Sequence, residues 1–494
     1  MHRFKDFPMS MHTVTTRKLS ERDGSPRLWL EGKRLLNSGF EPGHQFVVEP
    51  YGLGVVLKLQ VQGTNKVSRR ERKKDGRIDS IIDVRDSTAL APLMGCKAIR
   101  VVFGERQVFV SPMASELRLI RRVKRLMERL KAGKSLATAG VASGGGVLDH
   151  ALHAGLRKAG IKAHLHAFNE IREDLTEQAL EHNELLNDST IVLNLPLQEL
   201  AFDEMVMDRI GEVDVVCMGL PCSGASKAGR AKRRTDMPEA HPEVGHLVAG
   251  AVALLAKLNA SVCIFENVIP WGNSASACIL RQQLRDMAYE THERVLSGPE
   301  FGDLEARERF YMVAVSRGMD FDFDAMASKP ACSSRTLADV LEPEEVVKDR
   351  WSTMDGLKAK QERDKEAGKN FMMRVFKAED TFIGGLTKGM TKNRSTDPKI
   401  QHPTNPELLR VPTAIEHAAC KGIPKHLIEG LPQTKANELL GQSVTYGAAS
   451  SLGEHAGREI LRWANSFGHC VKTALQQLRK TVPVGQSELF SAAA

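Results

Sequence analysis

The sequence Gly219-Leu220-Pro221-Cys222-Ser223-Gly224 places a thiol directly after an apolar run, and Phe265-Glu266-Asn267-Val268 places a carboxyl after a second one. Short, continuous apolar runs are typical of strands buried on both faces of a parallel sheet. In open α/β sheets, ligands collect at the carboxyl ends of the strands. We therefore expect Cys222 and Glu266 to meet at one edge of a sheet. The two runs are Val213–Met218 and Ala260–Phe265.

Cys222 has the surroundings of a reactive thiol. Pro221 restricts the backbone before it, and a basic segment follows it. Nearby positive charge favours the thiolate, which is the nucleophilic form of cysteine. A single cysteine in a reduced chain can equally be a small buried hydrophobic residue, so the thiol alone leaves both readings open. The basic residues are Lys227, Arg230, Lys232, Arg233 and Arg234, in a segment that we expect to form a mobile flap.

Five motifs in one order resemble those of the DNA cytosine-C5 methyltransferases. The resemblance covers roughly residues 135–318 and 410–457. Each motif by itself is weak, but the order and spacing together are specific. The motifs are Pro221-Cys222; Glu266-Asn267-Val268; Arg307-Glu308-Arg309; Arg410-Val411-Pro412-Thr413 with Glu416 and Gly422-Ile423-Pro424; and Thr434-Lys435 leading to Gly441-Gln442-Ser443-Val444.

The resemblance implies a covalent reaction on a cytosine. Cytosine C5 is a poor nucleophile until a thiolate adds at C6, and this role falls to Cys222. Glu266 would then act as the acid at ring atom N3, and Arg307 and Arg309 would stabilise charge at O2. A base stacked in a duplex is out of reach, so the target cytosine must swing out into a pocket. The basic segment after Cys222 would close over it.

The expected methyl donor is S-adenosylmethionine. A predicted strand, a glycine-rich turn and a predicted helix follow one another between residues 136 and 159, an order that suits a nucleotide or cofactor loop. The next strand ends before Glu170, where an acid can bind ribose hydroxyls. The resemblance places Ile171 beside the adenine and adds Pro221 and Ser443 to the cofactor contacts. The expected glycine contacts are Gly140, Gly144, Gly145 and Gly146.

Composition agrees with a nucleic-acid enzyme. The 494 residues carry a net charge of +8, which favours a polyanionic partner, here double-stranded DNA. The 8 cysteines show no metal-binding spacing, and we expect the pairs His150/His153 and His164/His166 to be solvated or to border the core, so no metal is expected. Without a signal peptide or long apolar stretch, we expect a cytoplasmic location. The resemblance implies a bacterial, phage or plasmid origin, and we expect a monomer.

The expected fold class is α/β, a Rossmann-like S-adenosylmethionine-dependent methyltransferase core with an inserted target-recognition domain and a small β-rich N-terminal domain. Residues 28–59 resemble the AbrB-like swapped-hairpin barrels, and the charge run 69–74 could contact DNA or be a solvated face. The expected linking helix has an apolar stripe with arginines on its other side. The expected divisions are a disordered lead-in 1–24, the β-rich domain 25–110, the linking helix 111–134, the catalytic core 135–318, target recognition 319–409, the completion of the core 410–480 and a flexible tail 481–494.

Two other functions remain open from the residues alone. One is a catalytically silent DNA-binding regulator on the same fold, although it would not need Cys222, Glu266, Arg307 and Arg309 together. The other is an RNA cytosine-C5 methyltransferase that uses the same thiolate chemistry. The long segment 319–409 and the extra N-terminal domain favour duplex DNA.

Overall fold

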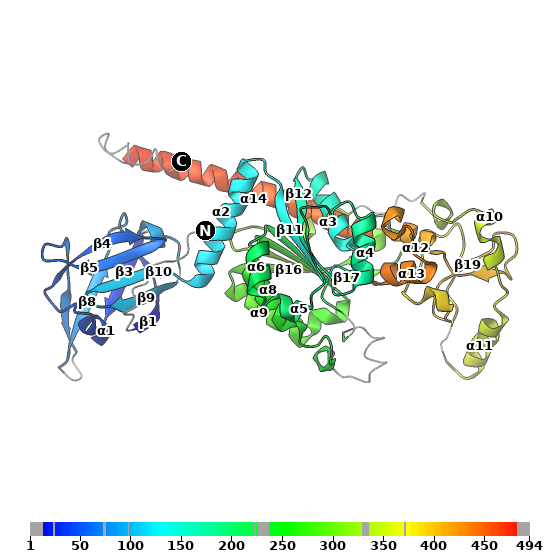
Figure 1. Ribbon diagram of the computed structural model, residues 1–494, viewed down its shortest axis with the longest axis horizontal. Helices are drawn as coiled ribbons and strands as arrows, with labels where there is room; N and C mark the ends of the chain where they lie inside the picture. The colour runs from blue at the N-terminus through cyan, green and yellow to red at the C-terminus, as the bar shows by residue number, and fades with distance from the viewer. Residues whose placement is uncertain are drawn as a thin grey trace. The chain divides into compact units, whose positions relative to one another are not determined.

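The computed structural model describes residues 13–22, 25–72, 76–96, 98–221, 224–225, 237–328, 335–369 and 372–481 (Figure 1). By its contacts the chain divides into two compact units, Met1–Arg121 and Arg122–Ala494. Cys222 and Ser223 lie outside the described residues, as does most of the basic segment that follows them. The expected tail after residue 481 also lies outside them.

The N-terminal unit is rich in β-structure, as expected. Its described strands form a sheet ordered β1-β9-β10-β5-β4-β6 and a second sheet ordered β2-β3-β8-β7. A hydrophobic core of its own joins residues such as Leu28, Phe46 and Val101. The elements are β1 Thr13–Lys18, β2 Ser20–Arg22, β3 Ser25–Glu31, α1 Lys33–Asn37, β4 Gln45–Tyr51, β5 Gly54–Leu59, β6 Asn65–Lys66, β7 Ser68–Glu71, β8 Ile78–Val84, β9 Ala98–Gly104 and β10 Gln107–Pro112.

One expectation for this unit was wrong. The lead-in predicted as disordered contains β1, which pairs antiparallel with β9, and β2, which pairs with β3. Its polar residues gave no apolar alternation, because an edge strand can leave most of its side chains in solvent. The strands β9 and β10 form a hairpin, with Arg106 in the left-handed region at φ 58°.

Within the described part of the second unit, seven strands form one sheet in the order β13-β12-β11-β14-β15-β17-β16. The first five strands run parallel, β17 is antiparallel to β15, and β16 is antiparallel to β17 and so runs in the direction of the first five. The strands are β11 Leu136–Val141, β12 Ala163–Asn169, β13 Ile191–Leu193, β14 Val215–Met218, β15 Val262–Asn267, β16 Tyr289–Ser297 and β17 Glu308–Ser316.

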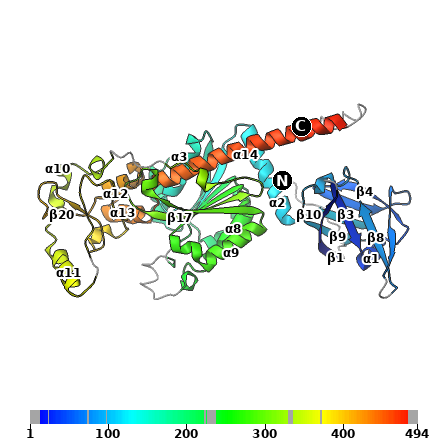
Figure 2. The same cartoon turned by 180° about the vertical axis from the view of Figure 1, so that it is seen from behind.

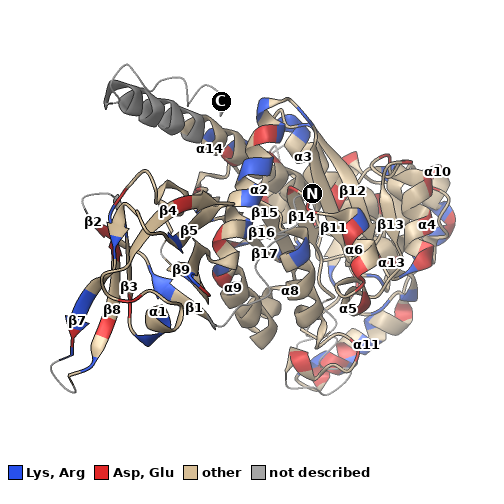
Figure 3. Ribbon diagram, turned by 60° about the vertical axis from the view of Figure 1, so that its left-hand side comes forward, with Lys and Arg blue, Asp and Glu red and all other residues tan. Residues whose placement is uncertain are grey.

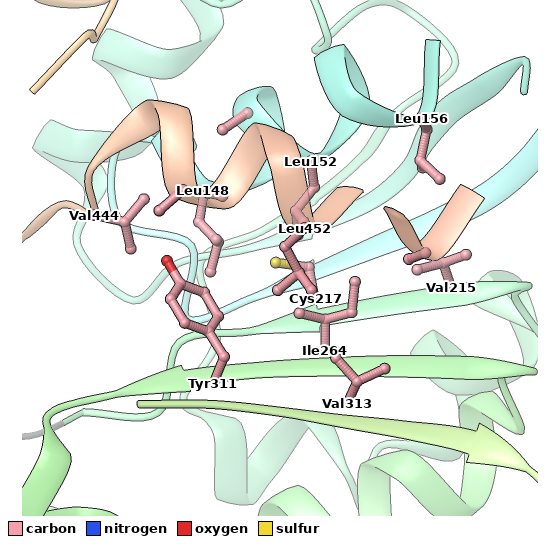
Figure 4. Packing of buried hydrophobic residues seen from close by; sticks show 14 of the residues in the cluster. Leu148, Leu152, Leu156, Val215, Cys217, Ile264, Tyr311, Val313, Val444 and Leu452 are labelled. Carbon is pink, nitrogen blue, oxygen red and sulfur yellow. The ribbon is translucent and has the colours of Figure 1, made fainter. Parts of the chain in front are cut away.

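Helices cover both faces of this sheet, and Figure 1 shows α3 and α14 on one face and α8 and α9 on the other. Successive residues of a strand therefore pack in different cores. Cys217 and Ile264 pack with α3 and α14 (Figure 4). Val216 and Phe265 pack on the opposite face of the sheet. Burial on both faces explains the continuous apolar runs in the sequence. The helices are α3 Val147–Lys158, α4 Glu173–His182, α5 Leu197–Leu200, α6 Glu204–Ile210, α8 Leu247–Leu258, α9 Ala275–Asp286 and α14 Tyr446–Thr481.

Glycines allow α14 to approach α3 closely. A Cβ on Gly155 would lie 2.1 Å from the carbonyl oxygen of Ser450, and one on Gly453 would lie 2.5 Å from that of Leu152. Both glycines leave room for the facing backbone, and any side chain would force the helices apart. The C-terminal segment is thereby packed on the core.

The helix α2, Ala114–Lys131, corrects an expectation about its arginines. Arg122 was expected on the outer side, but it is fully buried. Its guanidinium donates to Ser316 Oγ at 2.8 Å and to the Met287 carbonyl at 3.0 Å, and it lies 3.7 Å from the centre of the Tyr289 ring. Full hydrogen bonding is what allows a buried guanidinium here.

Within the described part of residues 319–409, Leu337, Ile383 and Ile400 share a smaller core with Leu304 and Cys420. Residues 319–326 pack instead in the core that contains α3 and α14. Figure 2 shows α12 and α13 between the central sheet and α11. Acidic and basic residues are mixed along α11 (Figure 3), and Lys358 of this helix donates to Glu407 at 2.5 Å. The elements are α10 Glu344–Val347, α11 Asp355–Glu366, β18 Val375–Phe376, β19 Lys399–Gln401 and β20 Leu409–Arg410, followed by α12 Ala414–Cys420, η9 Lys425–Ile428 and α13 Gln433–Gln442.

None of the helices in the described ranges is both long enough and apolar enough to span a membrane.

Candidate active site

The strand order reverses between β11 and β14, and both strands end at the same edge of the sheet. From β11 the chain moves outward through β12 and β13, then returns to the other side of β11 with β14. The ends of the two strands are in register, Val141 beside Met218, and Gly219 N donates to the Val141 carbonyl at 3.1 Å. Such a switch point is where open α/β sheets bind ligands. It brings the glycine-rich turn beside the segment that leads to Cys222.

Asn267 fixes the backbone just before Cys222. Its amide Nδ2 donates to the Leu220 carbonyl at 3.1 Å, and its Oδ1 accepts from Val268 N at 2.8 Å. Asn267 is buried at the end of β15, so this link joins the ends of β14 and β15. The sequence identified Asn267 as part of a motif but gave it no task. In the structure, the side chain of Asn267 holds the Leu220-Pro221 backbone in place. Pro221 itself is exposed.

Glu266 and Arg309, which the motifs predicted to share one site, form an ion pair at this edge. Glu266 Oε1 lies 2.9 Å from Arg309 Nε, and the two side chains are 13% and 17% exposed. They meet because β17 runs antiparallel to β15, so its first residues lie beside the last residues of β15. Burial raises the pKa of Glu266, while Arg309 and Arg307 lower it, and the net change is upward. A carboxyl with a raised pKa can carry a proton and still face cations.

Arg307 is held from three sides. Its guanidinium donates to the Gly441 carbonyl at 2.8 Å and to the Leu386 carbonyl at 3.4 Å, and lies 3.7 Å from Glu305 Oε1. The other oxygen of Glu305 accepts from the buried ammonium of Lys421. Sequence reasoning missed Glu305 and Lys421 as supports of Arg307. The sequence held no signal for them, because the full burial that makes a lysine and a glutamate require partners is seen only in the fold.

Gly441, in the last motif, has a packing requirement of its own. A Cβ there would lie 2.0 Å from Lys388 N, so only glycine allows α13 to approach this backbone. The same close approach places the Gly441 carbonyl within reach of Arg307. The motif therefore contributes a backbone oxygen to the site.

On the β11 side, Glu170 contacts the glycine-rich turn. Its carboxylate accepts from Gly144 N at 2.7 Å and from Arg172 N at 3.0 Å. Gly144 adopts φ +58°, and no atom lies within 4 Å of its Cβ position, so its surroundings are open. Ile171 is 60% exposed beside the buried Glu170. A buried carboxylate, an open glycine turn and an exposed apolar side chain fit the ribose and adenine of S-adenosylmethionine.

Four other predicted cofactor residues make close contacts with neighbouring groups of the protein. Gly140 lies inside β11 rather than in the turn, where a Cβ would lie 2.5 Å from Asp149 Oδ1. Gly145 and Gly146 have Leu439 and Asn183, respectively, within 2.6 Å of their Cβ positions. Ser443 ends α13, and its hydroxyl donates to the Leu439 carbonyl at 2.8 Å.

Residues 150–458, more than half of the chain, match the sequence profile of a family described as C-5 cytosine-specific DNA methylase. The chain belongs to the C-5 cytosine-specific DNA methylase family. The match includes Glu266, Arg307 and Arg309 and begins after the glycine-rich turn.

Relatives and solved structures agree with this family. The chain is 25% identical over 256 residues to the Type II methyltransferase M.MspI of Moraxella sp, covering 50% of this chain and 56% of that protein's length. It is 23% identical over 250 residues to the Type II methyltransferase M.NlaX of Neisseria lactamica, covering 50% and 76%. The chain therefore spans little more than half the length of the Moraxella relative.

Two solved structures share the fold. The Dnmt2 methyltransferase of S. pombe superposes with a TM-score of 0.51 at 19% identity, covering 65% of this chain and 97% of the other. The methyltransferase EhMeth of Entamoeba histolytica superposes with a TM-score of 0.51 at 15% identity, covering 65% and 98%. The expected Rossmann-like methyltransferase core is confirmed.

Proposed function

We propose that this chain transfers a methyl group from S-adenosylmethionine to C5 of a cytosine in duplex DNA. The observation that carries the proposal is the Glu266–Arg309 ion pair at the switch-point edge, beside the Leu220-Pro221 backbone that Asn267 holds. A proton-bearing acid and fixed cations next to a Pro-Cys segment are the groups that C5 methylation needs. Membership of the cytosine-specific family supports the same chemistry.

In this proposal Cys222 adds as thiolate to C6 of a flipped-out cytosine, and Glu266 donates a proton to N3. The new C6–S bond leaves an enamine whose C5 is nucleophilic. Arg307 and Arg309 lie on the O2 side and stabilise the charge that spreads there. C5 would then take the methyl group of the bound donor, with S-adenosylhomocysteine as the leaving group. Loss of the C5 proton and of the thiolate, with return of the N3 proton to Glu266, then restores the aromatic ring.

S-adenosylmethionine would be held by Glu170 at its ribose hydroxyls, by Ile171 at its adenine and by the backbone around Gly144. Bound there, it supplies an electrophilic methyl group. Gly219 N bonds the Val141 carbonyl, so the cofactor turn and the Pro221-Cys222 segment leave adjacent strands. That adjacency supports a single reaction site.

Two observations favour DNA over RNA as substrate. The matching family is described as a DNA methylase, and the Moraxella and Neisseria relatives are Type II methyltransferases. In the chain between β17 and α12, residues including Leu337, Ile383 and Ile400 belong to a smaller hydrophobic core, and we assign target recognition to residues 319–409. We further propose that the N-terminal unit, with its AbrB-like segment, adds to the DNA-binding surface.

The proposal is tested by methyl transfer from labelled S-adenosylmethionine to duplex DNA and to tRNA. We expect transfer to cytosine C5 of the duplex only, and Cys222→Ala should abolish it while duplex binding persists. Cys278→Ala, which removes an exposed cysteine, is the matched control and should remain active.

Each alternative has its own outcome in this assay. Transfer to tRNA alone would identify an RNA methyltransferase, and duplex binding without any transfer would identify a silent regulator. Turnover by Cys222→Ala would refute the covalent step.

A further inference from the structure

Three side chains from distant parts of the chain converge outside the candidate active site. His150 lies on α3, Glu184 follows α4, and His426 lies on η9. His150 Nε2 is 2.8 Å from Glu184 Oε1, and His426 Nε2 is 3.2 Å from Glu184 Oε2. One ligand atom from each lies within 4.8 Å of the others. We propose that this His150-Glu184-His426 cluster binds a divalent transition-metal ion such as Zn²⁺.

The donor types fit such an ion. Two imidazole nitrogens and one carboxylate oxygen form a common ligand set for zinc, and imidazole also suits Co²⁺ and Ni²⁺. Metal–ligand bonds of about 2.0–2.1 Å at tetrahedral angles separate ligand atoms by about 3.3 Å. The two histidine–glutamate distances are already near that value. Mg²⁺ prefers oxygen ligands and should bind poorly.

Tyr446 supplies the outer partner that a ligating histidine needs. Its hydroxyl lies 2.7 Å from His150 Nδ1, on the side of the ring opposite to Glu184. With a metal on Nε2, Nδ1 carries the ring proton and donates it to Tyr446 Oη, which fixes both tautomer and ring orientation. His150 is buried, so its position is preset.

The other two ligands can adjust to the ion. The side chains of Glu184 and His426 are 57% and 44% exposed, so they have room to close around a cation arriving from solvent. Water can fill the fourth position on the open side. The site therefore combines one fixed, buried ligand, His150, with two ligands that can move, which suits an ion that exchanges with solvent.

A metal here would fasten the C-terminal segment to the cofactor half of the core. Next to the cluster, Gln178 Nε2 already donates to the carbonyls of Leu427 and Glu429, beside His426. His150 lies one helical turn after Gly146, the last glycine of the turn. The ion would therefore add a crosslink across the same boundary.

Sequence spacing could not identify this site. It paired His150 with His153, but the structure turns His153 inward to contact Thr138 Oγ1 at 2.7 Å. The true partners of His150 are 34 and 276 residues away, which only the fold brings together.

The test uses the full-length, untagged chain after chelation and buffer exchange, with Co²⁺ as the probe. We expect one equivalent to give the visible absorption of nitrogen- and oxygen-bound Co²⁺, without thiolate charge-transfer bands, and Zn²⁺ to displace it. Mg²⁺ should not compete. Zn²⁺ should also raise the midpoint of thermal unfolding, since it binds only the folded state.

Variants assign the signal to the cluster. His426→Ala and Glu184→Gln, both at exposed positions, should abolish the Co²⁺ spectrum, and Tyr446→Phe should weaken binding about tenfold or more. His182→Ala, which removes a neighbouring histidine outside the cluster, should bind as the unchanged chain does. Circular dichroism checks that each variant folds. Absence of Co²⁺ binding, or binding that survives in His426→Ala and Glu184→Gln, would overturn the proposal and leave a hydrogen-bonded His-Glu-His network.

Discussion

At the scale of single residues, opposing influences set the protonation of Glu266. Burial favours its neutral form, and Arg309 at 2.9 Å favours its charged form. Burial prevails, so the pKa is raised and the acid form persists to higher pH than for an exposed glutamate. This balance suits a group that donates a proton to a base and is then stabilised as a carboxylate.

Glu266→Gln keeps the shape of the side chain but removes its proton. We expect the rate of methyl transfer to fall about 10²–10⁴-fold, the usual range for general acid catalysis, with DNA affinity little changed. The unchanged chain should also lose rate as pH rises through the raised pKa of Glu266, and the variant should lack that decline. Single-turnover rates across a pH series measure both.

Glu293→Gln is the matched control, because Glu293 lies on β16 of the same sheet and pairs with Arg281 of α9 rather than with a residue of the candidate site. It should leave the rate unchanged. A near-normal rate for Glu266→Gln would refute its role at N3.

At the scale of elements, the candidate site is formed where the ends of several strands, loops and helices meet. Arg307 precedes β17, but its partners belong to the segment before η8, Met390–Lys392, and to α13. Glu305 links the segment before η8 to the end of α12, accepting from Leu386 N at 2.6 Å and from Lys421. The buried Glu305–Lys421 pair thus joins residues 305, 386 and 421 behind the arginine.

Glu305→Gln should destabilise this junction. It leaves Lys421 buried without its carboxylate, and breaking a buried ion pair costs about 3 kcal/mol or more. Burial already lowers the pKa of Lys421 to about 7, so proton loss limits the cost to the lower end of that range. Urea denaturation measures the free energy of unfolding.

The double variant Glu305→Gln with Lys421→Met should recover most of the lost stability, because it leaves no unpaired charge in the interior. Strictly additive effects of the two substitutions would contradict the coupling. Activity should stay low in both variants if Glu305 orients Arg307.

At the scale of the whole molecule, two compact units with separate hydrophobic cores share one chain. The N-terminal unit exposes Arg69 and Arg70 on β7, although Glu71 and Glu31 lie beside them at 3.6 and 2.9 Å. These acids compete with phosphate for the arginines. The salt dependence of the affinity for duplex DNA therefore measures how much this unit contributes to DNA binding.

Replacing both Arg69 and Arg70 by alanine in the full chain should weaken duplex binding. The slope of log affinity against log salt should fall by up to about 1.8, since each phosphate contact contributes about 0.9. Arg17→Ala with Lys18→Ala on β1 removes the same charge as a control. If the Arg69/Arg70 variant gives the same salt slope as the Arg17/Lys18 control and the unchanged chain, β7 is not part of the DNA footprint.

The sequence by itself predicted the buried strands, and its motifs indicated the proposed reaction and the candidate residues Glu266, Arg307 and Arg309, because these depend on local apolar runs and on motifs in a fixed order. The ion pair between Glu266 and Arg309 came from the tertiary structure, because the antiparallel β17 brings Arg309 beside the end of β15. Tertiary structure alone decided the tasks of Asn267, Glu305, Lys421 and Gly441, and the meeting of His150, Glu184 and His426. Those contacts join residues up to 276 positions apart, and no local pattern encodes them.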